Sequence, residues 1–371
     1  MSSVIDGRSH LDEASLLAAA RAGDRAAFDR LLATRRDTLL AHCYRMLGSI
    51  HDADDAHQDA LLRAWRGLSG FDERSTLDTW LHRIATNASL DVIGRRARRS
   101  LPVEHVTDGV AGNGVRHEPA RWIEPFAHPV DAAGPEASIV RRESVELAFT
   151  VALQHLPPNQ RAVLLLRDVL GFSAKDSAGI LDASVAAVTS SLQRARRTLA
   201  ERRPRISQQR TIGRLADPDL AELVGRYVTA WERADAAAIV ELLTDDATFS
   251  MPPHPSWYRG AADIGRFLEA EPLQLPWRLV PCIVGGQVAF ACYSLDGARW
   301  VAHSLDVVTL RGDRIEHVVG FLDPTLVTRA GLPAELADPP RGASAGTDPV
   351  AARIAADVAA GVGSVVTRPA P

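Results

Sequence analysis

The feature that most constrains the fold is a change in the spacing of apolar residues near residue 215. In residues 11–99 and again in residues 138–203, apolar side chains recur three or four positions apart, as in amphipathic helices. Beyond Arg214, two more helical stretches lead into runs rich in Val and Ile, which are typical of strands. The sequence therefore predicts two all-helical domains, followed by an α+β domain.

The last part of this pattern predicts a curved antiparallel sheet flanked by helices. Two short turn sequences, Gly285-Gly286 and Arg311-Gly312-Asp313, separate neighbouring β-rich runs and predict hairpins. The helical stretches that precede the sheet span residues 220–243. The predicted strands fall within residues 247–251, 277–293, 300–311 and 314–322.

Composition places the domain boundaries. Glycine and proline recur between the two helical domains and cannot continue a long helix there, so we expect a linker. The C-terminal end has few large apolar residues, which predicts disorder. The expected division is a first helical domain, a linker, a second helical domain, an α+β domain and a tail, at residues 10–100, 101–137, 138–206, 215–332 and 333–371.

The overall charge of −4 hides an asymmetry that bears on function. Residues 1–214 hold 30 basic and 26 acidic residues, whereas residues 215–371 hold 12 and 20. A basic part that can meet nucleic acid is thus joined to an acidic part. The sequence has no apolar run of membrane length and no apolar N-terminal stretch. Its three cysteines predict neither disulfides nor a zinc site, so we expect a reduced cytoplasmic location, no metal and no cofactor.

Two clusters of arginines lie where helices are expected to end. One follows Asp91, and the other lies in a helix predicted from Val185 to Leu199. A helix predicted from Ala174 to Leu181 and a turn at 182–184 precede the second cluster, which is helix–turn–helix spacing. Arginines at helix ends can also simply stabilise the helix dipole in solvent. Two clusters behind two helical domains favour DNA binding.

Four segments of the helical part resemble extracytoplasmic-function sigma factors of bacterial RNA polymerase. The resemblance covers about half of the chain in the order that this family shows, and it lies in residues 52–66, 75–91, 156–163 and 185–196. It implies a non-enzymatic transcription initiation factor that binds core RNA polymerase and directs it to promoters.

The resemblance also implies which residues meet each partner. The first helical domain would bind the β′ coiled coil of the core enzyme and recognise and melt the −10 element. The second would bind the β flap and the −35 element. Residues implied for core binding are Asp55, Gln58, Asp59, Leu62 and Trp65; for the −10 element Trp80, Arg83, Asn87, Arg95 and Arg96; for the −35 element Ser190, Ser191, Arg194, Arg196 and Arg197.

Physical chemistry supports these roles but leaves alternatives open. Carboxylates on a helix face suit a basic protein surface better than DNA, and arginine and asparagine are side chains that hydrogen-bond bases. Trp65 and Trp80 can equally be core residues. His57 and His82 replace the apolar or aromatic residues usual in the family, and Thr189 and Ser191 stand where many members have basic residues, which leaves the promoter sequence undetermined.

The linker and the last domain extend the resemblance. Residues 121–126 are similar to a short motif of sigma factors that carry a SnoaL-like extension, and residues 215–332 resemble a SnoaL-like domain. We expect Trp122 and Phe126 to dock between domains, because exposed aromatic side chains in a linker are unfavourable. The candidate lining of a pocket for a small ligand comprises Trp231, His254, Trp257, His303 and Asp306.

The resembling domain is expected to regulate rather than to catalyse. His303 and Asp306 lie three positions apart on a predicted strand, which places them on opposite faces and argues against an acid–base pair. Fusion to the helical domains and opposite charge favour regulation of the sigma domains by contact. Two other readings stay open: a one-component regulator that senses a ligand, and a SnoaL-type enzyme tethered to DNA.

Overall fold

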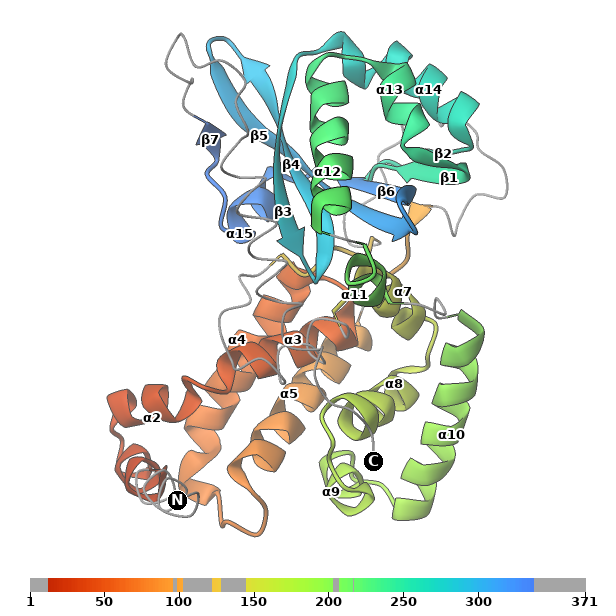
Figure 1. The fold of residues 1–371 in the computed structure, drawn as a ribbon. Coiled ribbons are helices and arrows are strands. Elements are labelled where there is room, and N and C mark those ends of the chain that lie inside the picture. Colours follow the sequence, from red (N-terminus) through yellow and green to blue (C-terminus); the bar gives the residue numbers. More distant parts are fainter. Residues whose placement is uncertain are drawn as a thin grey trace. The chain divides into compact units, whose positions relative to one another are not determined.

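The computed structural model describes residues 13–95, 99–102, 122–127, 145–202, 207–215 and 217–336. The chain divides into two compact units (Figure 1). Unit 1 comprises residues 1–98 and 152–202, so it joins the two predicted helical domains, and unit 2 comprises residues 99–151 and 203–371. The domain boundaries proposed from the sequence stay predictions, and the tail from residue 337 lies outside the described part of the chain.

The first segment of unit 1 is a group of helices, three of which begin at residues whose side chains cap them. The side chain of Asp24 accepts hydrogen bonds from the first turn of one helix, and those of Ser49 and Thr76 do the same for two others. Helix α3 ends at Gly48, which adopts the left-handed conformation. Their bounds are α2 Arg25–Leu32, α3 Arg36–Leu47, α4 Ile50–Gly67, the 3₁₀ turn Leu68–Gly70 and α5 Leu77–Ile93.

The second segment of unit 1 contains the helix–turn–helix. Pro157 and Pro158 stand where helix α8 begins, and Ser173 caps α9. Asp182, in the left-handed region at φ 50°, turns the chain into the next helix, whose first turn is capped by Ser184. The elements are α7 Leu147–Gln154 at the boundary between the units, α8 Pro158–Leu164, the π-helical turn Leu165–Val169, α9 Ala174–Ile180 and α10 Val185–Arg202.

Unit 2 is a mixed sheet with helices packed against it (Figure 1). The strand order is β2-β1-β6-β5-β4-β3, and β7 pairs with β5 beside the main path. Its helices are α11 Gln208–Ile212, α12 Asp217–Glu232, α13 Ala236–Glu241, α14 Ala261–Ala270, the 3₁₀ turn Pro272–Gln274 and α15 Pro324–Arg329. Its strands are β1 Leu243–Ser250, β2 Trp257–Arg259, β3 Trp277–Val284, β4 Gln287–Asp296, β5 Arg299–Arg311, β6 Arg314–Phe321 and β7 Glu335–Leu336.

The helical and α+β character predicted from the sequence is confirmed, with one correction to the sheet. Both predicted hairpins are present, joining β3 to β4 and β5 to β6. The sheet was expected to be antiparallel, but β1 and β6 pair in parallel. These two strands are far apart in the sequence, so no turn sequence reports on their direction.

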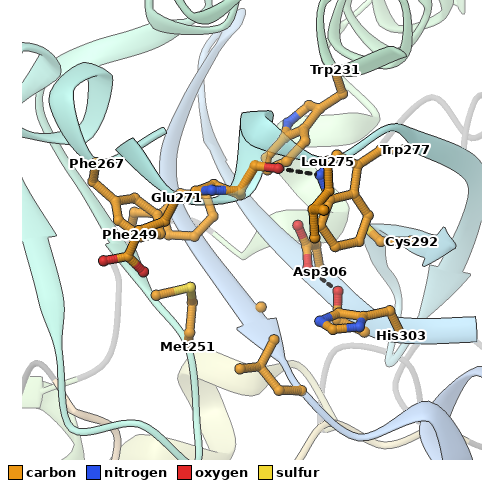
Figure 2. A pocket seen from close by; sticks show the side chains of 14 residues that line it. Trp231, Phe249, Met251, Phe267, Glu271, Leu275, Trp277, Cys292, His303 and Asp306 are labelled. Carbon is orange, nitrogen blue, oxygen red and sulfur yellow. Dashed lines mark hydrogen bonds between the residues drawn. The ribbon is translucent and has the colours of Figure 1, made fainter. Parts of the chain in front are cut away.

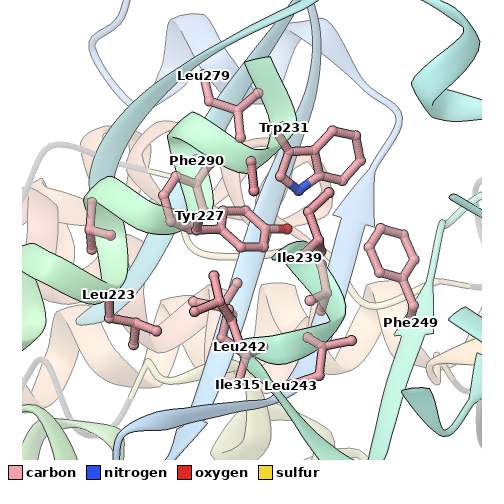
Figure 3. Close-up of a cluster of buried hydrophobic side chains, with 14 of the residues drawn as sticks. Leu223, Tyr227, Trp231, Ile239, Leu242, Leu243, Phe249, Leu279, Phe290 and Ile315 are labelled. Atoms are coloured by element: carbon pink, nitrogen blue, oxygen red, sulfur yellow. The ribbon is translucent and has the colours of Figure 1, made fainter. Parts of the chain in front are cut away.

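The core of unit 2 lies between α12 and the sheet (Figure 3). Tyr227 of α12 is fully buried, and its ring centroid lies 4.5 Å from that of Phe290 in β4. Helix α12 also packs against β3, and α13 packs against α14. This arrangement holds the helices over one face of the sheet and leaves a cavity beside the core, described below. Within the described residues, none of the helices combines the length and apolarity that crossing a membrane requires.

Candidate functional site

The exposed face of α4 carries the residues predicted to bind the core enzyme. Asp55 and Gln58 are exposed, and Leu62 keeps 47% of its surface exposed although it is apolar. Asp59 is half-buried and pairs with Arg63 at 2.7 Å. Trp65 follows Leu62 by three residues on the same side of α4, but it is only half-exposed because its ring packs 5.1 Å from that of Phe28. The face is therefore acidic with one exposed apolar side chain, and Trp65 is partly a packing residue.

Helix α5 presents Arg83 and Asn87 on its exposed surface, four residues apart and therefore on one face. Trp80 lies one turn earlier but is only half-exposed, because its ring packs 5.0 Å from that of Phe71. Of the residues predicted for the −10 element, the arginine and the asparagine are thus open to solvent, whereas the tryptophan also supports the helix.

The arginine cluster predicted at the end of α5 is described only in part. The helix ends at Ile93, and Arg95 is exposed. Arg96 lies outside the described residues. Arg99 is buried in unit 2, where its guanidinium donates a hydrogen bond of 2.6 Å to the carbonyl of Trp122. Only part of the cluster is therefore available for a polyanion.

Helix α10, the second helix of the helix–turn–helix, carries arginines that differ in their contacts. Arg194 is exposed and donates hydrogen bonds to Ser190 and Ser191, at 2.7 and 3.2 Å. Arg197 is also exposed. Arg196 instead forms a two-armed hydrogen bond with Asp168, at 2.9 and 2.6 Å. Because such paired contacts fix a guanidinium in place, Arg196 joins α10 to the preceding turn, and Arg194 and Arg197 remain the freer cations.

A buried arginine joins the two segments of unit 1. Arg161 of α8 is only 4% exposed, and it donates to the side chain of Gln154 at 2.6 Å and to the carbonyl of Leu156 at 3.1 Å. It also donates to the carbonyl of Met46, near the C-terminal end of α3. A guanidinium has five donors in a planar fork, which suits several carbonyls at once. No local sequence pattern indicated a structural role for Arg161.

Two buried histidines lie where the first segment meets the second. The Nε2 atom of His42 lies 2.9 Å from the hydroxyl of Thr86, and its ring centroid lies 5.5 Å from that of His82. The ring of His82 lies 5.1 Å from Phe172 of the second segment. Burial lowers the pKa of both rings, and for His42 the charges of His82 and Arg45 lower it further. Both rings are thus held neutral in the folded chain.

The two linker aromatics lie inside unit 2. Trp122 is 4% exposed, and its Nε1–H donates to the carbonyl of Pro253 at 3.1 Å. Phe126 is equally buried and lies beside Gly285 in the turn between β3 and β4. Gly285 has φ 56°, and a Cβ there would lie 2.9 Å from the carbonyl oxygen of Val145. A glycine at this turn therefore allows the chain near Val145 to approach the sheet.

Unit 2 holds the chain at both ends of the helix–turn–helix segment. Before that segment, the backbone N–H of Leu147 donates to the side chain of Gln287 at 2.6 Å. After it, the backbone N–H groups of Gln208 and Gln209 donate to the carboxylate of Glu146, at 3.1 and 3.0 Å. The entry and the exit of the segment are thus tied to each other as well as to the sheet.

A cavity of about 230 Å³ lies inside unit 2 (Figure 2). Figure 2 shows Phe249 and Phe267 on one side and Trp277, His303 and Asp306 on the other. Trp231 and His303 line it as predicted candidates, whereas His254 and Trp257 do not. Trp257 is in edge strand β2, buried beneath the guanidinium of Arg259. The full lining is Trp231, Phe249, Met251, Phe267, Glu271, Pro272, Leu275, Trp277, Cys292, His303, Ser304, Asp306, Gly320 and Leu322.

His303 and Asp306 line the same cavity, contrary to the prediction that they would lie on opposite faces. The reason is a bulge in β5: Cys292 of β4 pairs with Ser304, but the next residue, Tyr293, pairs with Ala302. His303 is the extra residue, which breaks the alternation and turns its side chain toward the cavity. Strand periodicity alone cannot report a bulge.

Asp306 is the buried ionisable group of this cavity. It is 4% exposed, and its neighbours are the hydroxyl of Ser304, which donates at 3.2 Å, and the thiol of Cys292. Burial raises the pKa of Asp306 to about 6, and these two hydrogen bonds oppose that rise only in part. On the neighbouring strand, Gly320 faces Asp306 so closely that a Cβ there would lie 2.9 Å from its carboxylate.

Three family comparisons agree with the architecture. Residues 31–99 match Sigma-70 region 2, residues 146–199 match Sigma-70 region 4, and residues 224–318 match the SnoaL-like domain.

Related proteins extend this match over most of the chain. The chain is 44% identical over 310 residues to the ECF RNA polymerase sigma factor SigG of Mycobacterium tuberculosis, covering 81% of this chain and 82% of that protein. It is 27% identical to SigJ of the same organism, over 82% of this chain and 94% of SigJ. The crystal structure of SigJ superimposes with a TM-score of 0.51 at 24% identity, over 82% of this chain and 99% of that one, which supports the shared fold.

Proposed function

The chain belongs to the extracytoplasmic-function sigma factors of RNA polymerase. We propose which of its surfaces bind the core enzyme and which bind promoter DNA. The observation that carries the proposal is the presence of both sigma regions, in order, in a chain 44% identical to a named sigma factor over most of its length.

We assign core binding to the exposed face of α4. Asp55 and Gln58 offer oxygen atoms to a basic partner, and Leu62 offers an exposed apolar side chain at the centre of the same face. An exposed leucine beside carboxylates favours a protein partner, because DNA would be repelled by the carboxylates. The partner implied by the family resemblance is the β′ coiled coil of the core enzyme.

We assign promoter binding to α5 and α10. Arg83 and Asn87 are exposed on one face of α5, and both residue types hydrogen-bond base edges. Arg194 and Arg197 of α10 are exposed at a helix–turn–helix and can contact DNA phosphates, whereas Arg196 positions the helix through Asp168. Region 2 would thus read the −10 element and region 4 the −35 element, with the β flap as a further partner of region 4.

The SnoaL-like domain would regulate the sigma regions rather than catalyse a reaction. Support comes from the hydrogen bonds within unit 2 made by the backbone N–H groups of Leu147 and Gln208, which lie near the start and after the end of region 4. Trp122, which lies between region 2 and region 4 in the sequence, is buried. Any change in unit 2 that released these contacts would lengthen the free chain that joins the two DNA-binding regions. The reach of region 4 would change accordingly.

The assignment of core binding to α4 and of promoter binding to α10 is tested with the full chain, sigma-free core polymerase and a promoter template. Leu62→Ala should lower the affinity for core at least severalfold without changing the promoter preference of the remaining holoenzyme. Arg194→Ala should leave the affinity for core unchanged and lower promoter-specific initiation, with a smaller dependence of DNA binding on salt. If Leu62→Ala left core binding intact and Arg194→Ala weakened it, the assignment of the two faces would be wrong.

Regulation is tested separately with Trp122→Ala, which removes the buried ring from unit 2. We expect a change in promoter-directed transcription at unchanged affinity for core. Trp122→Phe is the matched control, because it keeps most of the buried apolar surface and loses only the hydrogen bond to Pro253. Equal activity of the Trp122→Ala variant and the original chain on several promoters would contradict regulation through this contact.

A further inference from the structure

The charged groups that line the cavity of unit 2 are carboxylates. Its ionisable lining residues are Glu271, Cys292, His303 and Asp306, and no arginine or lysine is among the described residues that line it. Burial lowers the pKa of His303, and burial raises the pKa of the Cys292 thiol well above its ordinary value, so both are neutral at pH 7. The charges that remain are those of the carboxylates.

Asp306 is poorly compensated for a buried carboxylate. Its described hydrogen-bond partners, Ser304 and Cys292, are neutral donors. A carboxylate that has left water without a cation beside it carries a desolvation penalty, which is why its pKa is raised. A cationic group of a ligand would remove that penalty, an anionic one would increase it, and a neutral hydroxyl would remove it only in part.

The rest of the lining suits a ring attached to such a cation. Trp231, Trp277, Phe249 and Phe267 surround the space with aromatic side chains, and aromatic faces attract both apolar rings and ammonium groups. Glu271 is exposed at the cavity and adds a second carboxylate. For size, an apolar cavity of about 150 Å³ is known to hold benzene. A cavity of about 230 Å³ therefore has room for one ring with a short side chain.

We propose that the cavity of the SnoaL-like domain binds a small apolar amine as its ammonium ion, with the ammonium group against Asp306 and the ring among the tryptophan and phenylalanine side chains. The binding site lies wholly within unit 2 and does not require polymerase or DNA. The inference thus goes beyond the sigma function and can fail or hold independently of it.

Matched probes of one shape and different charge test the proposal by titration calorimetry on the full chain at pH 7.5. The probes are 2-phenylethylamine, 2-phenylethanol and phenylacetate, with benzylamine and 3-phenylpropylamine to vary the length. We expect at least one of the amines to bind at least tenfold more tightly than the alcohol, and phenylacetate not to bind. Tighter binding of the alcohol or of phenylacetate, or no binding by any of the amines, would overturn the proposal.

A pair of variants assigns the effect to the cavity carboxylate. Asp306→Asn keeps the shape of the side chain and removes its charge, and it should reduce the preference for amine over alcohol by tenfold or more. Asp245→Asn removes an exposed carboxylate of β1 outside the lining and should leave that preference unchanged. Far-ultraviolet circular dichroism of each variant establishes that it is folded. A folded Asp306→Asn chain that still preferred the amine would show that Asp306 is not the recognition group.

Discussion

The proposed functional side chains lie on the surface of unit 1 but in the interior of unit 2. In unit 1 the proposed functional side chains lie on exposed helix faces, such as Arg83 of α5 and Arg194 of α10. In unit 2 the candidate functional groups line a cavity, with Asp306 at 4% exposure. Exposed polar side chains on helix faces suit binding to macromolecules, whereas a lined cavity suits small ligands.

Their buried polar groups differ as well. In unit 1 the guanidinium of Arg161 is surrounded by carbonyl and amide oxygens that accept its hydrogen bonds. In unit 2 the carboxylate of Asp306 has a hydroxyl and a thiol beside it and no cation among its described contacts. A buried group with several hydrogen bonds to acceptors stabilises one structure, whereas an under-compensated one costs stability and leaves capacity for a ligand. Substitutions at the two sites should therefore act in opposite directions.

The largest expected effect is the loss of stability on replacing Arg161 with alanine. The change leaves several buried acceptors without a donor and breaks the link to Met46, which should destabilise unit 1 by about 3 to 5 kcal/mol. Urea unfolding followed by circular dichroism measures the loss. Hydrogen exchange in peptides from α3 and α8 assigns it to unit 1.

Arg197→Ala is the control, because it removes an exposed arginine from the same segment and should change stability by less than about 0.5 kcal/mol. Equal stability of the Arg161→Ala and Arg197→Ala chains would mean that the buried hydrogen bonds of Arg161 do not hold the two segments together.

The next effect is a gain of stability in unit 2 on replacing Asp306 with asparagine. The rise of the Asp306 pKa from 3.8 to about 6 corresponds to about 3 kcal/mol at 1.36 kcal/mol per pKa unit. The raised pKa means that protonation favours folding between pH 6 and the unfolded pKa near 4. The variant should thus be the more stable chain at pH 7.5, and the difference should fall to about 1 kcal/mol at pH 4.5 because the unfolded carboxylate is still mostly ionised there.

Thermal unfolding at these two pH values checks the prediction, with Asp245→Asn as the control for removal of an exposed charge. An Asp306→Asn chain that was less stable than the original at pH 7.5 would mean that the carboxylate is better compensated than its contacts indicate.

The smallest effect is the pH response of unit 1, and its sign is opposite to that of Asp306. The pKa of His42 and that of His82 lie below the ordinary value in the folded chain, so the unfolded chain takes up protons first as the pH falls. Unit 1 should keep its full stability above about pH 6.5 and lose up to about 1.4 kcal/mol per pH unit for each ring below it.

Hydrogen exchange in α3 and α5 peptides at pH 7.5 and pH 5.5 measures this loss. In His42→Gln, a neutral amide that can still bond Thr86 replaces one titrating ring, and the loss should be smaller. Stability of unit 1 that rose on acidification would contradict the assignment of both histidines as buried neutral rings.

The same contrast explains what the sequence could predict. In unit 1 the functional residues lie on single helices, so local spacing was enough to place Arg83 with Asn87 and to find the helix–turn–helix from Ser173 to α10. The contacts that join sequence-distant segments of unit 1 could not be predicted from local spacing. The contact of Arg161 with Met46 has no local signal.

In unit 2 the sequence predicted the hairpins and strands but only part of the cavity. Trp231 and His303 were found, whereas the phenylalanines at 249 and 267 come from different elements and only the fold brings them together. The parallel pairing of β1 with β6 and the bulge at His303 arise from long-range pairing, which periodicity does not report. Asp306, a carboxylate between Leu305 and Val307, was also predicted to line the pocket.

The role of unit 1 in directing core polymerase to promoters can be tested by in vitro transcription. Purified full-length chain is mixed with sigma-free core RNA polymerase and a genomic template, and the 5′ ends of the transcripts are sequenced. We expect discrete start sites that are absent without the chain and are weakened in a variant with reduced affinity for core, such as one with Leu62 and Asp55 both replaced by alanine. Binding of the chain to DNA without core, together with an unchanged set of start sites, would contradict this role of unit 1.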